Sequence, residues 1–178
     1  MQRITGSEYY LSGLLTPKTV TIQATAYVRG FAAGLSRTVD IYENSPVIAM
    51  ERADGVWKVC TPQGSVSASK VILSVNGHLQ SFGFLKQRLM HIFLYASMTR
   101  ALSVEEVRKL GGEPSWGVAP ANPFGSSVRK ISGVGGHRIL MRNKFHFNAT
   151  MEASDRDVRR AVRDHTRSFQ RRFPMLKD

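Results

Sequence analysis

Residues 39–79 constrain the fold most, because they order four strand-like runs around tight turns. The runs at 47–50 and 56–60 flank Ala53-Asp54-Gly55, and an Asp-Gly pair readily takes the positive φ angles of a hairpin turn. Residues 62–64 provide the next turn. The segment therefore predicts an antiparallel hairpin followed by a third strand at 65–68.

The fourth run, residues 70–75, is almost continuously apolar, as in a strand that is buried on both faces. This run predicts a parallel sheet. It leads into Ser74-Val75-Asn76-Gly77, a small turn whose backbone can approach a ligand closely because glycine has no Cβ. No strand upstream of the run carries the glycine fingerprint that places a dinucleotide pyrophosphate on a helix N-terminus.

Apolar periodicity predicts two long helices. Apolar residues recur every three or four positions over 24–35, which indicates an amphipathic helix with one buried face. A second helix is expected from 154 to 172, with Ser154 as its N-cap. A short strand is expected at 20–23. The buried stripe expected on the second helix consists of Val158, Val162, His165 and Phe169.

Residues 85–150 have the pattern of an antiparallel sheet. The stretch 89–99 is rich in aromatic and β-branched residues and predicts one long strand. A capping-box pattern at 103–106 predicts a short helix that ends at Gly111-Gly112. Three more short antiparallel strands are expected within 114–147, with residues 133–136 as a hairpin loop.

The composition fits a folded domain with an excess of positive charge. The chain has 178 residues, 42% of them hydrophobic, and a net charge of +12. Such a charge favours polyanions, but the lysines and arginines are spread along the chain and form no evident nucleic-acid footprint, so nucleic acid is an unlikely partner. A stand-alone basic module for an anionic ligand or nucleic acid remains the alternative interpretation.

Several classes of site lack support in the sequence. Cys60 is the only cysteine, and the five histidines are scattered without the spacing of a zinc site, so no metal is expected. No Gly-x-Ser-x-Gly elbow is present. The residues alone identify no catalytic group. The apolar runs are too short to cross a bilayer and the N-terminus has no signal-peptide pattern, so a cytoplasmic location is expected.

Several short motifs along the chain become informative when they are read together. They are Gly6-Ser7-x-Tyr9-Tyr10, Gly13-Leu14-Leu15, Gln23-x-x-x-Tyr27-Val28-Arg29-Gly30, Tyr42-Glu43-Asn44-Ser45-Pro46-Val47, Val71-Ile72-Leu73-Ser74-Val75-Asn76-Gly77, Tyr95-Ala96-Ser97-Met98-Thr99, Trp116-Gly117 and Ile139-Leu140-Met141-Arg142-Asn143. Together these motifs resemble the interior of FAD-dependent oxidoreductases of the D-amino-acid oxidase superfamily. Within that superfamily, the chain is most similar to bacterial gamma-glutamylputrescine oxidase and similar amine or amino-acid oxidases.

The resemblance implies an α+β fold made of an incomplete FAD-binding α/β lobe and an antiparallel substrate-binding sheet with flanking helices. It places the first lobe at 1–84, the second at 85–150 and a basic amphipathic helix at 151–178. The glycine-rich segments that hold FAD at the two ends of such enzymes are not found, so the chain resembles an internal fragment. We therefore expect little FAD binding or activity from the chain alone, and a homodimer is a possible consequence of exposed truncated surfaces.

The resemblance also implies binding residues. The backbone at Val47 would meet the adenine edge of FAD, and Ser74, Asn76 and Gly77 would approach the cofactor. In the enzyme, FAD would take hydride from a carbon that bears an amine, with a small amine or amino acid as substrate.

In the substrate lobe, Arg129 and Arg142 would lie on strands that face the flavin, where a guanidinium can form two hydrogen bonds with a substrate carboxylate. Either arginine could instead be a surface charge. Tyr95 would border the substrate pocket, although an aromatic side chain on a strand could equally be part of the core.

Overall fold

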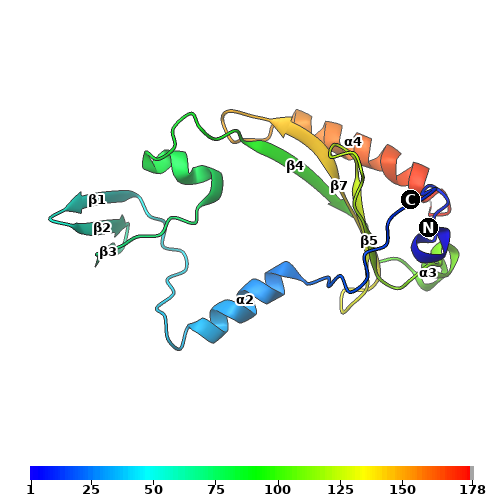
Figure 1. The fold of residues 1–178 in the computed structure, drawn as a ribbon, viewed down its shortest axis with the longest axis horizontal. Helices are drawn as coiled ribbons and strands as arrows, with labels where there is room; N and C mark the ends of the chain where they lie inside the picture. Colours follow the sequence, from blue (N-terminus) through cyan, green and yellow to red (C-terminus); the bar gives the residue numbers. More distant parts are fainter. Residues whose placement is uncertain (177–178) are drawn as a thin grey trace. The chain divides into compact units, whose positions relative to one another are not determined.

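A computed structural model describes residues 1–176 of the chain. Within them, the strands of both sheets pair in the antiparallel sense. The structure divides into two units (Figure 1): residues 1–15 with the chain from 90 onward, and residues 16–89. One three-stranded and one four-stranded sheet, together with several helices, confirm the α+β class. Residues 1–15 belong to the same unit as the four-stranded sheet.

The three-stranded sheet contains β1 (Ala49–Ala53), β2 (Val56–Thr61) and β3 (Gly64–Ala68) in the order β1-β2-β3. Asp54 and Gly55 connect the first two strands with φ angles of 50° and 80°. These positive angles suit the Asp-Gly pair, so the predicted hairpin and its third strand are confirmed.

Residues 70–75 form no strand, and the expectation of a buried parallel strand is wrong. Ile72 is 91% exposed, and among the described residues no strand pairs with this run. The backbone amides and carbonyls of this run have no neighbouring strand with which to form hydrogen bonds, so the run does not join a sheet. The run leads into η1 (Asn76–Phe82), a 3-10 helix. The short strand expected at 20–23 is absent as well.

The helix α2 (Ala24–Leu35) has the predicted bounds, and the Gln23 side chain accepts a hydrogen bond from the Ala26 amide at its start. The predicted buried face is wrong, because none of the helix residues is buried. Tyr27 and Phe31 stack on each other with ring centroids 6.3 Å apart while both stay more than half exposed.

The four-stranded sheet contains β4 (Ile92–Met98), β5 (Trp116–Val118), β6 (Ser127–Ile131) and β7 (Arg138–Phe147) in the order β4-β7-β6-β5. All neighbouring strands are antiparallel, which confirms the sheet predicted for this region. The predicted hairpin loop is also confirmed, since the Gly136 amide donates to the Gly133 carbonyl.

One face of this sheet packs under α4 (Asp155–Arg172), which lies along β4 and β7 (Figure 1). Ser154 accepts the Asp157 amide at the predicted N-cap. The expected buried stripe is only partly right, because His165 is buried whereas Val158 and Val162 are 43% and 52% exposed. The core consists of Leu110, Trp116, Val128, Ile139, Met141, Phe173 and Leu176.

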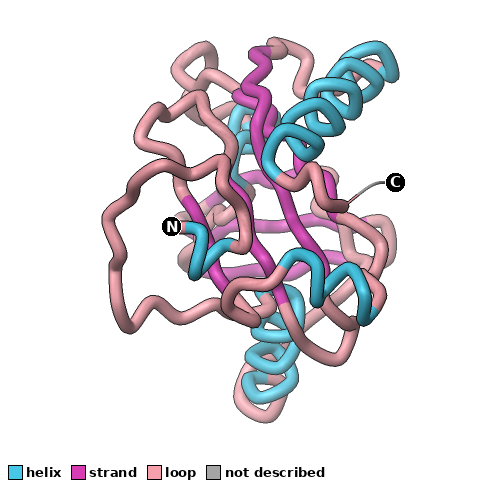
Figure 2. The backbone as a smooth tube through the Cα atoms, turned by 90° about the vertical axis from the view of Figure 1, so that its right-hand side faces the viewer, coloured by secondary structure: helices cyan, strands magenta, loops and turns pink. Residues whose placement is uncertain are grey.

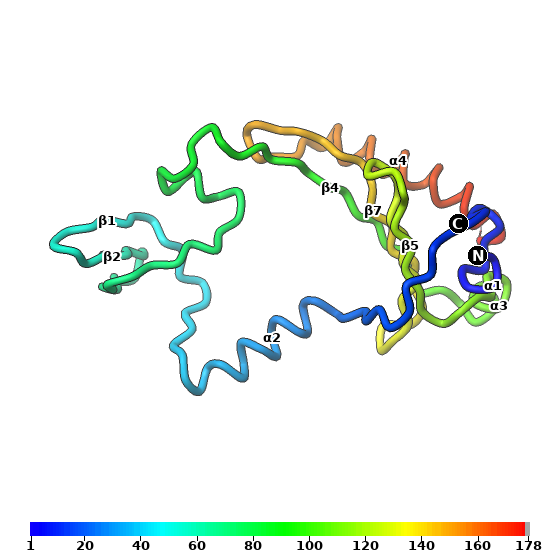
Figure 3. Tube along the Cα trace, viewed as in Figure 1, coloured from blue at the N-terminus to red at the C-terminus, as the bar shows by residue number. Residues whose placement is uncertain are grey.

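The two short helices α1 (Gln2–Thr5) and α3 (Val104–Leu110) lie side by side near the chain ends (Figure 3). After α1 the chain continues as a long loop (Figure 2). The Glu113 amide donates to the Ile4 carbonyl. Gly112, with a φ of 72°, would carry a Cβ only 2.6 Å from that same carbonyl oxygen. A side chain at this position would therefore separate the two segments.

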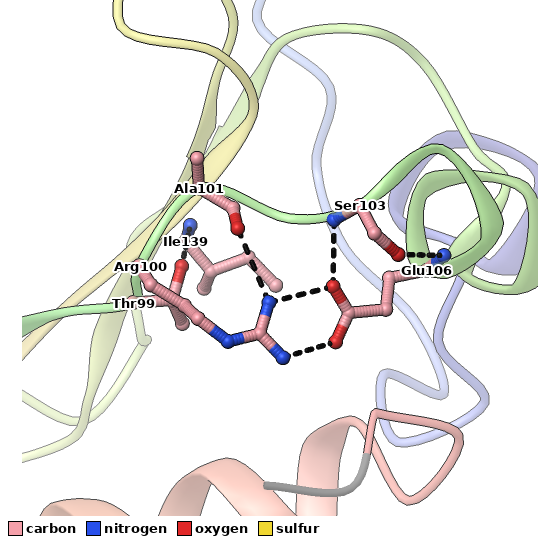
Figure 4. A network of polar contacts seen from close by, with 6 residues as sticks. All are labelled: Thr99, Arg100, Ala101, Ser103, Glu106 and Ile139. Atoms are coloured by element: carbon pink, nitrogen blue, oxygen red, sulfur yellow. Dashed lines mark hydrogen bonds and ion pairs between the residues drawn. The ribbon is translucent and has the colours of Figure 1, made fainter.

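The predicted capping box opens α3 (Figure 4). The Ser103 hydroxyl accepts the Glu106 amide, and the Glu106 carboxylate accepts the Ser103 amide. Both Arg100 Nη atoms donate to the same carboxylate at 2.8 Å. This bidentate pair fixes the end of β4 to the start of α3.

Candidate functional site

The face of the four-stranded sheet that α4 does not cover is exposed. Alternate residues of β4 face away from the helix, and Ile92, Leu94 and Met98 are 44%, 42% and 54% exposed. Side chains on successive strand positions point to opposite faces, so pairing extends this surface onto the neighbouring strands. We call it the open face; its members include Ile92, Leu94, Ala96, Met98, Gly117, Ser127, Arg129, Leu140 and Arg142.

The open face brings Arg129 and Arg142 together. Arg129 on β6 pairs with Leu140 on β7, and Arg142 on β7 pairs with Ser127 on β6. The two arginines are therefore diagonal neighbours on adjacent strands, a placement that separates them by about 7–8 Å at the backbone. Both are exposed, and neither forms an ion pair with any part of the chain that the structure describes.

This arrangement suits an anion with two oxygens. A guanidinium can donate two parallel hydrogen bonds to one carboxylate, and an anion that lies between two guanidinium groups offsets the repulsion between their charges. Strands hold the two backbones at fixed spacing. The site can therefore bind and orient a carboxylate on an otherwise apolar surface that includes Leu94, Met98 and Leu140.

Tyr95 lies on the opposite face of the sheet. Its hydroxyl is 3.4 Å from Nδ1 of His146, which in turn is 4.0 Å from the Asp157 carboxylate of α4. The tyrosine therefore belongs to the helix-covered side and does not share a surface with Arg129 and Arg142.

The four residues expected to contact a cofactor lie in the unit of residues 16–89. Val47, 38% exposed, lies two residues before β1, and the Ile48 amide that follows it donates to the Cys60 carbonyl at 2.9 Å. Ser74 and Asn76 are exposed, and Asn76 has a φ of 52°. The predicted turn runs into η1, whose first two residues are Asn76 and Gly77. The absence of a Cβ at Gly77 suits the close approach of a flat or phosphate-bearing group to the backbone.

The helix-covered face holds a polar pair that the sequence did not indicate. The Ser97 hydroxyl lies 2.6 Å from Nδ1 of His165, which is 3% exposed. Burial lowers the pKa of His165 below its usual value near 6.5. The pair borders a cavity of about 650 Å³ between β4, β7 and α4. The sequence carried two separate signals for this pair: the helical periodicity that placed His165 on a buried stripe, and the alternation of β4 that places Ser97 on the same side as Tyr95. Neither signal indicates that the two side chains meet.

Lys130 is a second polar residue that the sequence analysis missed. It is 2% exposed on β6, and its ammonium donates to the Gly111 carbonyl at 2.8 Å. Burial lowers its pKa. Since this carbonyl lies at the C-terminal end of α3, the positive charge stabilises the negative end of the helix, and the contact is structural.

Residues 1–176 show neither a metal-binding cluster nor a helix suited to crossing a membrane. No group of three or more histidine, cysteine, aspartate or glutamate side chains is arranged to hold a metal ion. None of the described helices has the length and apolar character that crossing a membrane requires.

Comparison with known proteins identifies the family. The family model described as "DAO: FAD dependent oxidoreductase" matches residues 2–178. No curated protein and no solved structure was found to match the chain. Because the match extends over nearly all of the chain, the protein belongs to the FAD-dependent oxidoreductase family of the D-amino-acid oxidase type.

Proposed function

We propose that the chain forms part of a flavin-dependent enzyme that oxidises a small amine or amino acid, close in type to gamma-glutamylputrescine oxidase. The family match supports flavin-dependent oxidation. The observation that carries the substrate proposal is the pair Arg129 and Arg142, which lie diagonally on the open face without an anionic partner among the described residues.

In this proposal the open face binds and orients the substrate. Arg129 and Arg142 hold a carboxylate of the substrate, while Leu94 and Met98 exclude water from the carbon that bears the amine. Water exclusion strengthens the charge-assisted hydrogen bonds to the carboxylate. The chemistry that bound FAD would supply there is acceptance of a hydride from that carbon. The strands supply the geometry, because their fixed spacing leaves the bound substrate little freedom to rotate.

Backbone at Val47 and in the turn of Ser74, Asn76 and Gly77 would hold the cofactor. The chain would supply only part of the binding lobe, so we expect it to hold FAD weakly and to be inactive by itself. Exposed apolar residues in residues 16–89 support this view, since Tyr27, Phe31 and Ile72 are 61%, 59% and 91% exposed. Surfaces of this kind are normally covered. Further polypeptide, or a second copy of the chain, would cover them.

The test uses the protein expressed in full from its natural gene. The purified protein should be yellow with bound flavin and should oxidise members of a panel of amines and amino acids. Arg129→Met and Arg142→Met should each raise KM for amino-acid substrates about 10- to 100-fold, as expected for the loss of a charge-assisted hydrogen bond. Arg156→Met, an exposed change on α4, is the matched control and should leave KM unchanged. A colourless protein that is inactive on the whole panel would overturn the proposal.

A further inference from the structure

The strand β4 is an edge of the four-stranded sheet and, within residues 1–176, pairs with β7 alone. The Thr99 amide donates to the Ile139 carbonyl of β7 at 3.0 Å, so the odd-numbered residues at this end of β4 direct their backbone groups toward β7. Hydrogen bonding alternates along a strand, so Ala96 and Met98 direct their backbone groups outward.

The edge of β4 lacks the features that normally prevent an edge strand from pairing with another polypeptide. All seven residues from Ile92 to Met98 are uncharged, and none is proline or glycine. Edge strands of soluble proteins usually carry a lysine, a proline or a cover that prevents pairing with another strand. The edge is thus able to accept an additional strand.

A cavity of about 650 Å³ lies beside the edge, between β4, β7 and α4. Its inner wall is mainly apolar, with Met141 and Phe169 among the lining residues. Thr166 and Gln170 of α4 line it as well, and both are exposed, so the cavity is open on their side. A strand added to β4 would direct every second side chain toward this cavity.

The open side of the cavity is bordered by positive charge. Arg159 and Arg163 are four residues apart on α4 and lie at helical spacing from Thr166 and Gln170, so they share that side of the helix. Both arginines are exposed, and no carboxylate within residues 1–176 forms an ion pair with either of them.

The positive charge of Arg159 and Arg163 distinguishes two kinds of polypeptide that could pair with the edge of β4. Two copies paired through β4 would bring two such arginine rows together, in a chain whose net charge is already +12. Like charges that are brought together in this way repel each other. An acidic segment would instead meet Arg159 and Arg163 with opposite charge.

We propose that the edge of β4 binds an extended, acidic polypeptide segment by strand addition. Its backbone pairs with Ala96 and Met98, alternate apolar side chains enter the cavity, and its carboxylates meet Arg159 and Arg163. Backbone pairing supplies affinity in this mode, and the pockets for alternate side chains supply specificity. The surface is separate from the open face and does not depend on the proposed substrate.

The test is a titration of the purified 178-residue chain with a fluorescent seven-residue peptide, the length of β4, in which valine and glutamate alternate. Fluorescence anisotropy should show binding that weakens as salt is added. A matched peptide with lysine in place of glutamate should bind at least tenfold more weakly. Equal binding of the two peptides would overturn the proposal.

Variants locate the binding surface. Ala96→Pro removes one outward amide without touching the ladder to β7 and should abolish binding, whereas Ala96→Val keeps the amide and should bind normally. The double change Arg159→Gln and Arg163→Gln should weaken binding about threefold or more. If Ala96→Pro fails to fold, as judged by circular dichroism, the acidic peptide with alternate N-methylated amides should fail to bind the unaltered chain. The proposal would be overturned if Ala96→Pro and the N-methylated peptide both left binding intact, or if the chain formed a homodimer that excludes the peptide.

Discussion

At Glu106, one carboxylate accepts hydrogen bonds from the Arg100 guanidinium and from the Ser103 amide. These bonds, with the Arg100 bonds as the larger cause, lower the pKa of Glu106 from 4.5 to about 2. The folded state therefore binds this proton less readily than the unfolded state. The stability that Glu106 supplies is complete above pH 4.5 and is lost as the pH falls toward 2.

We expect Glu106→Gln to flatten the acid side of the stability profile. The measurement is the free energy of unfolding in urea at several pH values between 2 and 4.5. The unaltered chain should lose more stability across this range than the variant. Parallel profiles would show that the carboxylate is not stabilised in the folded state.

His165 predicts a second pH dependence, at higher pH. Its pKa is lowered chiefly because burial disfavours the charged ring. A lowered pKa means that stability is complete above the usual value near 6.5 and declines as the pH falls below it. His165→Gln should reduce this decline. The pKa measured by NMR titration of the ring should lie below that of an exposed histidine; a value equal to or above it would contradict the burial.

At the residue scale, the sequence could identify the arginines but not their surroundings. Arg129 and Arg142 follow from resemblance, yet their shared face depends on the register between β6 and β7. For Tyr95 the sequence predicted the strand but not the face. That face is set by pairing with β7 and by a bulge between Leu94 and Tyr95. Neither register nor bulge can be read from the alternation of one strand.

At the element scale, helix starts were predictable because they depend on local chemistry. Ser103 and Ser154 cap the helices that the sequence assigned to them, with Glu106 completing the capping box. The run 70–75 was not predictable in the same way. An apolar run becomes a strand only where another strand pairs with it, and none among the described residues does.

The end of α4 provides a test of the core. Phe173 is fully buried, with its ring centroid 6.3 Å from that of Trp116 and 5.2 Å from that of Phe169. Phe173→Ala should lower the free energy of unfolding by about 3–5 kcal/mol, because the lost contacts leave a cavity. Chemical denaturation measures this change. The exposed Phe124→Ala serves as a control and should cost far less; equal losses would place Phe173 outside the core.

At the scale of the whole molecule, the two units differ in how much of their apolar surface is covered. The unit with the four-stranded sheet contains the whole buried core, whereas α2 of the other unit has no buried residue. Periodicity gave the correct bounds for α2 but could not show whether a partner surface covers it. The family match extends over residues 2–178 and so includes both units.

The proposed role of Arg129 and Arg142, binding a substrate carboxylate on the open face, can be measured through substrate affinity. Its most direct test compares KM for an amino acid with KM for the amine that lacks its carboxylate, in the natural full protein and in Arg142→Met. The account predicts a rise of about 10- to 100-fold for the amino acid and no change for the amine. An unchanged KM for the amino acid, or an equal rise for both substrates, would contradict it.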